Sequence, residues 1–97
     1  MTNTIDSLTI AFQEGDLEKT RELDKYVLSK GAWTTIMYSY QDWDASKQVF
    51  GPVKYSIRRY QKRNDQYWQK SKFNISSPAQ AQKIVEILSA WLAVDPE

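Results

Sequence analysis

Cysteine and histidine are both absent from this sequence, which excludes the side chains on which many catalytic and zinc sites depend. Without them the chain has no thiol nucleophile, lacks the commonest general base and cannot build most zinc sites. Glycine is scarce, with three residues, and none of them belongs to a glycine-rich phosphate-binding loop. Asp42 and Asp44 are close enough in sequence to bind a hard cation, but a solvated loop is the commoner setting for such a pair. We therefore expect a protein that is not an enzyme and that needs no cofactor or metal.

Long hydrophobic runs are also missing from the chain. No stretch approaches the ~20 apolar residues that a membrane helix requires, and no signal-peptide pattern follows Met1. Because the absence of cysteine gives no sign of a disulfide-forming compartment, we expect a cytoplasmic protein without a membrane partner. The 97 residues suffice for one small domain, and 41% of them are hydrophobic, so the chain can bury a core. A domain of this size is only modestly stable alone, and dimerisation would strengthen it.

Charge is distributed unevenly along the chain, although the formal net charge is only +1. Residues 1–31 contain four Lys or Arg and six Asp or Glu, which gives a net charge of −2. Residues 32–76 contain eight basic and three acidic residues, net +5, and residues 77–97 contain one and three, net −2. The excess positive charge is therefore confined to the middle of the chain, and such asymmetry is a hint of an anionic partner.

Residues 52–76 predict a β-hairpin whose two strands are joined by a polar turn at Asn64 and Asp65. Alternate residues of a strand face opposite sides of the sheet, so the two sets can be considered separately. The odd-numbered side is largely apolar and is expected to face the core: Val53, Tyr55, Ile57, Tyr67, Phe73 and Ile75. The even-numbered side is cationic and includes two large aromatic residues: Lys54, Arg58, Tyr60, Lys62, Trp68, Lys70 and Lys72.

The pairing register of this hairpin depends on the length of its turn. A two-residue turn would place Ile57 opposite Lys72, so that a core residue would stand beside a surface charge. A three-residue loop instead places Ile57 opposite Phe73 and Arg58 beside Lys72, and we choose this register. Like charges directly opposite each other are unfavourable, so we expect a protein that displays them to bind an anion. The same register sets Lys62 opposite Trp68 and Tyr60 opposite Lys70.

The segments before the hairpin predict two helices and a further strand. Residues 4–13 and 17–29 have hydrophobic residues at helical spacing and are expected to form two short helices. Residues 32–43 are rich in β-branched and aromatic types and predict a strand whose facing is ambiguous. Residues 44–51 predict a polar loop, in which residues 47–50 could supply a fourth strand.

The C-terminal helix is the clearest element in the sequence. Ser77 suits the N-cap and Pro78 the first helical position. We expect the apolar stripe that follows to cover one face of the sheet and also to contact a second copy of the chain, partly through Ile87 and Trp91. The stripe consists of Ala81, Ile84, Val85, Leu88, Trp91 and Leu92, with Ile87 at its edge.

A cationic sheet face that carries aromatic residues fits the binding of single-stranded nucleic acid. Proteins that bind such strands combine a positively charged groove with aromatic rings on which bases stack. The residues of the even-numbered side of the hairpin are therefore the candidate contacts. One alternative is an ordinary solvated face whose aromatic rings cover the stems of Lys and Arg. Another is a protein-interaction module that uses exposed Trp and Tyr.

Several short motifs resemble those of the positive-cofactor-four type of transcriptional coactivator domain. They are VKYSIRRY from Val53, a basic turn, KFNISSPAQAQ from Lys72 and the closing amphipathic helix, and the likeness covers roughly residues 32–92. The resemblance implies a curved four-stranded sheet with a helix and a homodimer formed through helix and sheet. It also implies single-stranded DNA held across the two sheets with little sequence preference; Whirly-type proteins are similar in general plan.

Two positions of this sequence match the DNA-binding residues of that family, and a third departs from them. By position, Arg58 corresponds to the strand arginine that contacts DNA, and Lys72 to the basic residue before the strand-to-helix step. Gln61 stands where the family has a tryptophan, which makes Trp68 the candidate stacking residue instead.

These observations together predict one α+β domain over residues 1–97. We expect a helical extension at 1–31, a curved antiparallel sheet of three to four strands at 32–76 and a long helix at 77–94. The expected function is that of a homodimer that binds single-stranded DNA, or RNA, with little sequence specificity, in transcription regulation, replication or repair.

Overall fold

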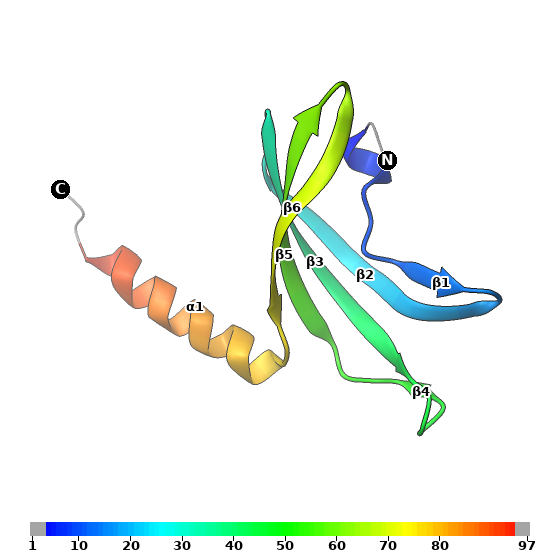
Figure 1. Ribbon diagram of the computed structural model, residues 1–97. Helices are drawn as coiled ribbons and strands as arrows, with labels where there is room; N and C mark the ends of the chain where they lie inside the picture. The colour runs from blue at the N-terminus through cyan, green and yellow to red at the C-terminus, as the bar shows by residue number, and fades with distance from the viewer. Residues whose placement is uncertain (1–3, 95–97) are drawn as a thin grey trace.

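The computed structural model describes residues 4–94 as a curled antiparallel sheet from which one helix projects (Figure 1). The strand order is β1-β2-β3-β5-β6, and the short β4 pairs with the end of β3. The predicted fold class is wrong, because the described chain has six strands rather than three or four and one 3-10 turn instead of two N-terminal helices. The elements are η1 (Ile5–Ser7), β1 (Phe12–Glu14), β2 (Leu17–Ser29), β3 (Trp33–Asp44), β4 (Val49–Phe50), β5 (Lys54–Arg63), β6 (Gln66–Ile75) and α1 (Pro78–Ala93).

The segment predicted as the second helix is the long strand β2. Two β-bulges interrupt its pairing with β3, one between Glu22 and Asp24 and one between Val27 and Ser29. Each bulge inserts an extra residue and so shifts the alternation of the side chains by one position. The period of two that marks a strand is therefore hidden in this part of the sequence, and its apolar residues fall at a spacing that resembles a helix.

Gly15 and Asp16 form the turn between β1 and β2. They lie between the two segments, residues 4–13 and 17–29, that were predicted to form helices. Glu14 pairs with Leu17 across the turn, and Gly15 has a φ of 63°, a left-handed conformation that glycine adopts without steric cost. The acidic N-terminal region is therefore largely a β-hairpin at the edge of the sheet.

One side of the sheet, which we call the covered face, lies beneath the N-terminal segment that precedes β1. Leu8 and Ile10 from this segment are buried in the same hydrophobic cluster as residues of β3, β5 and β6. The alternation of β3 settles the facing that the sequence left ambiguous, because one set of its side chains is buried. On β3 the covered face carries Thr34, Ile36, Tyr38 and Tyr40.

Lys25 of β2 holds the N-terminal segment against the sheet. Its Nζ donates hydrogen bonds to the backbone carbonyls of Ile5 at 2.8 Å, Asp6 at 3.2 Å and Leu8 at 2.6 Å. These carbonyls lie outside the strand ladder, and buried or half-buried backbone oxygens require such partners. A single ammonium group therefore fastens the covering segment at three points.

The opposite side of the sheet, which we call the open face, carries much of what was predicted to be the core. One row of paired residues crosses four strands on this side: Tyr26, Met37, Ile57 and Phe73. Phe73 is 52% exposed, whereas Tyr60, which was predicted to lie at the surface, is only 4% exposed. The predicted burial of Tyr67 and Ile75 is confirmed, at 8% and 5% exposed. For Phe73 and Tyr60 the prediction is wrong, because the alternation of the hairpin defines two faces but not which of them the remote N-terminal segment covers.

The turn of the β5–β6 hairpin is the shorter of the two that the sequence allowed. Asn64 and Asp65 are its two central residues, with φ of 53° and 61°, and Arg63 pairs with Gln66. Positive φ at both central positions is characteristic of a type I′ turn, which Asn and Asp tolerate better than most residues. The predicted three-residue loop is therefore wrong at this end of the hairpin.

A β-bulge then shifts the pairing by one residue: Arg59 pairs with Ser71 and Tyr60 with Gln69, which leaves Lys70 as an extra residue in β6. Beyond it Arg58 lies beside Lys72, and Ile57 opposite Phe73, as the chosen register predicted. The extra residue of the bulge therefore allows a two-residue turn at one end of the hairpin and the pairing of apolar residues with each other at the other end. On the turn side of the bulge the pairs differ from those expected: Tyr60 is opposite Gln69, Gln61 is opposite Trp68, and Lys62 is opposite Tyr67.

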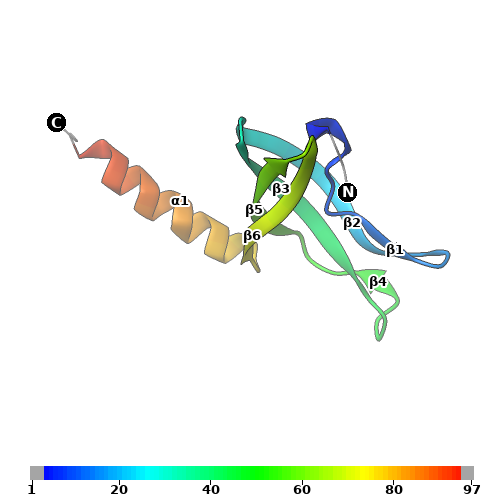
Figure 2. The same ribbon diagram turned by 45° about the horizontal axis from the view of Figure 1, so that its top comes forward.

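Helix α1 is confirmed, and it begins as the sequence predicts. The Ser77 side chain accepts a hydrogen bond from the backbone N–H of Gln80 at 3.1 Å, and Pro78 is the first helical residue. The helix follows β6, the edge strand, and points away from the sheet in both views (Figures 1 and 2). The expectation that it covers a face of its own sheet is therefore wrong. Among residues 4–94, neither this helix nor the 3-10 turn combines the length and the apolar character that crossing a membrane requires.

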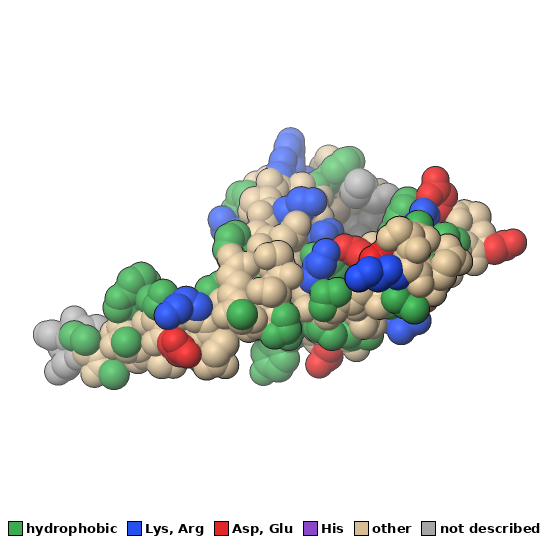
Figure 3. Space-filling view, turned by 90° about the horizontal axis from the view of Figure 1, so that it is seen from below, with side chains coloured by type: hydrophobic (Ala, Val, Ile, Leu, Met, Phe, Trp, Pro, Cys, Tyr) green, Lys and Arg blue, Asp and Glu red, His purple; other side chains and the backbone are tan. Residues whose placement is uncertain are grey.

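No residue of α1 is buried, and its apolar stripe is therefore presented to solvent. Trp91 is 70% exposed, and hydrophobic side chains line the surface of the projecting helix in Figure 3. A helix with one apolar side is normally stabilised by packing that side against another element. Within the described chain no such element covers it.

Candidate nucleic-acid interface

Arg58 and Lys72 lie side by side on the covered face, where the β5–β6 register pairs them. They line a hollow of about 430 Å³ between the hairpin and the N-terminal edge of the sheet. Lys54, also predicted as a contact, lies on the same face, where it pairs with Tyr40 of the neighbouring strand β3. The other residues that line the hollow are Ile10, Ala11, Phe12, Thr20, Tyr40, Asp42 and Asn74.

Polar contacts fix the arginine at the wall of this hollow. Arg58 Nε donates to Ser56 Oγ at 3.3 Å, and Arg58 Nη1 donates to Gln69 Oε1 at 3.1 Å. The hydroxyl of Ser56 in turn donates to Asn74 Oδ1 at 2.7 Å. The guanidinium is therefore held by neutral partners on two strands, so its charge is not cancelled by these contacts.

The acidic residue of the hollow has its own partners. Asp42 Oδ1 accepts from the hydroxyl of Thr20 at 2.9 Å, and Asp42 Oδ2 lies 3.4 Å from Lys54 Nζ. Lys54, one of the predicted contacts, is therefore already engaged in an ion pair. Such half-exposed pairs contribute little to stability, but this one places the charge of Asp42 against a cation other than Arg58 or Lys72.

Tyr60 is not available as a stacking surface on the described chain. Its hydroxyl lies 2.8 Å from the hydroxyl of Tyr38 in the core. Burial raises the pKa of both phenols above the ordinary tyrosine range, so both remain neutral and one hydroxyl can donate to the other. The sequence placed Tyr60 on the correct face, but that face is the one the N-terminal segment covers.

Trp68 and Lys70 lie near the tip of the hairpin. Trp68 is 41% exposed, as predicted, and it lines a second hollow of about 300 Å³ together with Arg63, Asn64 and Lys70. The pairing of Trp68 with Gln61, however, places it on the open face, opposite to Arg58 and Lys72. The predicted site is therefore split between the two sides of β6.

Lys62, the last of the predicted contacts, lies on the covered face at the tip of the hairpin. Its Nζ is 5.7 Å from the centre of the Tyr67 ring, a distance compatible with a weak cation–π contact. Lys62 is exposed and Tyr67 is buried, so the ammonium group sits above the rim of the core.

Sequence reasoning missed the cations of the open face. Arg59 lies with its guanidinium carbon 4.5 Å from the centre of the Trp33 ring, and Arg63 borders the Trp68 hollow. If the predicted register had included the bulge of this hairpin, it would have placed Trp68 on the same side of the sheet as Arg59 and Arg63. No local signal marks that bulge, since Lys70, the extra residue that it inserts in β6, is not a glycine.

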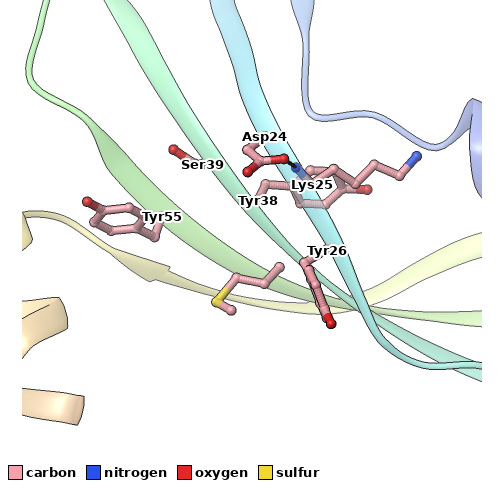
Figure 4. Close-up of a pocket in the computed structure, with 7 residues that line it drawn as sticks. Asp24, Lys25, Tyr26, Tyr38, Ser39 and Tyr55 are labelled. Atoms are coloured by element: carbon pink, nitrogen blue, oxygen red, sulfur yellow. Dashed lines mark hydrogen bonds between the residues drawn. The ribbon is translucent and has the colours of Figure 1, made fainter. Parts of the chain in front are cut away.

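The rest of the open face carries the row from Tyr26 to Phe73 and a shallow hollow of about 140 Å³. Figure 4 shows Tyr26 and Tyr55 on the strands that border it, while Lys25 and Tyr38 extend toward the N-terminal segment. Exposed and half-exposed aromatic residues, such as Tyr26 and Tyr55, suit a contact with another protein surface more than with a phosphate backbone.

Metal binding finds no support in the acidic residues. Asp44 Oδ1 accepts from the backbone N–H of Ser46 at 3.0 Å and of Lys47 at 3.2 Å. The hydrogen bond from the Ser46 side chain and these backbone bonds lower the pKa of this carboxyl. Within residues 4–94 no three acidic side chains gather into a group that could hold a metal ion. Asp44 therefore orders the β3–β4 turn.

Comparison with known proteins identifies no relative. No protein-family model, no curated protein and no solved structure matches this chain.

Proposed function

We propose that this chain binds single-stranded DNA, with the phosphates held at Arg58 and Lys72. The observation that carries the proposal is the placement of these two cations side by side at the wall of a polar hollow. Four ion pairs form within residues 4–94, and neither Arg58 nor Lys72 takes part in any of them. Two adjacent like charges repel each other, and a bound phosphate would relieve that repulsion.

The fixed orientation of Arg58 favours a phosphate as the anion. Two of its N–H groups are used by Ser56 and Gln69, and the others remain to form the paired hydrogen bonds that guanidinium groups make with phosphate oxygens. The resemblance to the coactivator domain supports the same two positions, because Arg58 and Lys72 are those it singles out for contact with DNA.

The second region of contact lies around the edge of β6. Because β6 is an edge strand, a flexible strand of DNA can pass from Lys72 on the covered face to Trp68 on the open face, where Lys70 borders the same hollow. Lys72 and Trp68 are four residues apart, which corresponds to about 13 Å along a strand. In this arrangement Trp68 supplies a ring for base stacking, and the cations on both sides contact the backbone.

A salt-dependent titration tests the proposal. Binding of labelled oligo-dT, followed by fluorescence anisotropy, should weaken steeply as salt rises, because phosphate contacts release counterions. The double variant Arg58→Ala/Lys72→Ala should bind more weakly. The slope of the logarithm of its binding constant against the logarithm of salt concentration should be smaller in magnitude by about 2. A matched control, Lys30→Ala/Lys83→Ala, removes the same charge from exposed sites that do not line the hollow and should behave nearly as the wild type.

The outcome also separates this function from a protein-interaction module. If the wild type fails to bind the oligonucleotide even at low salt, the exposed aromatic residues are better explained as contacts for a protein partner. If the double variant keeps the wild-type affinity and slope, DNA binding lies elsewhere on the surface and the assignment of Arg58 and Lys72 is wrong.

We further propose that the chain acts as a homodimer in which α1 and the open face are the contact surfaces. Ile87 and Trp91, the predicted dimer contacts, are 40% and 70% exposed, and the open face presents the row that ends at Phe73. One copy thus offers both an apolar helix and an apolar sheet face, which a two-fold symmetric pair can bury reciprocally. Sedimentation should show a dimer that Trp91→Ala weakens; a wild-type monomer at tens of micromolar protein would contradict the proposal.

A further inference from the structure

Phe12 lines the same hollow as Arg58 and Lys72, although no local pattern marked it as a binding residue. It belongs to β1, where it pairs with Thr20, and Thr20 pairs with Asp42 on β3. The hydrogen bond from Thr20 to Asp42 confirms that this row points to one side of the sheet, the covered face. The N-terminal hairpin thus brings an aromatic ring to the rim of the cationic hollow.

Phe12 is one of several aromatic residues that the described fold leaves exposed, and it is the one that lies beside the cationic hollow. Its side chain is 56% exposed beside a polar cavity. Within residues 4–94 its ring takes part in no aromatic pair and no cation–π contact; the rings that do are Trp33, Trp43, Phe50 and Tyr67. Its packing in the described fold therefore gives little reason for a ring at this position.

The hollow provides the other groups that an unpaired nucleotide requires. Its volume of about 430 Å³ is within the usual range for small-molecule sites. Asn74 accepts from Ser56 through Oδ1, so the donor end of its amide is not used in that bond. Arg58 and Lys72 supply positive charge for a phosphate on the side nearer β6.

We propose that this hollow is a subsite for a single unpaired base, in which the base stacks on Phe12 while its phosphate contacts Arg58 and Lys72. The inference rests on the proposed function and adds to it a recognition of bases on the covered face, independent of Trp68. Stacking requires only an aromatic ring at position 12, so tryptophan can replace phenylalanine there, whereas leucine preserves apolar packing but not the flat aromatic surface.

An oligonucleotide without bases separates stacking from phosphate binding. We expect Phe12→Leu to weaken binding of oligo-dT about tenfold and to leave binding of an abasic oligonucleotide of equal length unchanged. Phe12→Trp should restore oligo-dT binding. The variant Arg58→Ala/Lys72→Ala should weaken both ligands, and Leu17→Ala, on the same hairpin, should weaken neither. Melting curves of each variant establish that the fold is intact.

The possible results distinguish the base subsite from the proposed binding of single-stranded DNA. If the wild type binds oligo-dT but Phe12→Leu binds it equally well, the subsite is wrong while the proposed function stands. If Phe12→Leu weakens the abasic ligand as much as oligo-dT, the ring acts through packing and the stacking role is wrong. If the wild type binds neither ligand at low salt, the proposed function and the subsite both fail.

Discussion

Replacing Tyr60 with phenylalanine should destabilise the fold, because it removes one half of a buried hydrogen bond. The two phenolic oxygens of Tyr38 and Tyr60 are 2.8 Å apart, and the side chains are 0% and 4% exposed. Without Tyr60 Oη, the hydroxyl of Tyr38 is left buried without this partner, at a cost of ~1–3 kcal/mol. In a domain of about 100 residues, 1 kcal/mol lowers the melting temperature by ~4–8 °C.

The double variant Tyr38→Phe/Tyr60→Phe makes the test specific. With both hydroxyls removed no buried polar group remains unsatisfied, so its stability should exceed what the two single changes predict when added. Urea unfolding followed by circular dichroism gives the four free energies of the cycle. Protein concentration is held constant throughout, because association would shift the apparent stability.

A matched control is available on the open face. Tyr26 is 70% exposed, so Tyr26→Phe removes a hydroxyl from a solvated site and should leave the free energy of unfolding nearly unchanged. If Tyr60→Phe were as harmless as Tyr26→Phe, Tyr60 would lie at the surface, as the sequence alone predicts. The assignment of the covered face as the core would then be refuted.

Two further predictions follow from the same geometry. Trp68→Ala should weaken oligo-dT binding about tenfold, since stacking contributes ~1–3 kcal/mol per base, while the melting temperature stays nearly unchanged for a residue that is 41% exposed; a variant that unfolds would show that Trp68 packs in the core. Because burial raises the pKa of Tyr38 and Tyr60 in the folded state, the unfolded chain loses these protons first as pH rises. The stability that the pair contributes should be complete below about pH 10 and decline above it. Unfolding curves measured at alkaline pH should show a smaller decline in Tyr38→Phe/Tyr60→Phe.

The sequence by itself determined the elements whose signals are local. Ser77 and Pro78 set the start of α1, because capping depends on neighbouring backbone groups. The hairpin and the adjacency of Arg58 and Lys72 followed from matching two apolar strands, which requires only the residues of those strands. These are also the two residues on which the proposed phosphate contact rests.

The fold of the N-terminal third was not predictable from local spacing. Two bulges in β2 displace its alternation, so residues 17–29 show helical spacing although they pair along the length of β3. Long-range pairing outweighs such a weak local pattern, because every strand hydrogen bond and side-chain contact with β3 stabilises the extended form. Phe12 became a candidate contact only when β1 was placed at the rim of the hollow.

The tertiary structure alone decided which face of the sheet is the core. Alternation divides Tyr60 and Phe73 correctly between two faces, but both faces contain aromatic residues and neither is apolar throughout. Leu8 and Ile10, about 50 or more residues from Tyr60 in sequence, cover one of them, and Lys25 fastens their segment through three carbonyls. A single bulged position then moves Trp68 to the other face. Burial depends on contacts between remote segments, and a local pattern of hydrophobicity carries no information about which segments will meet.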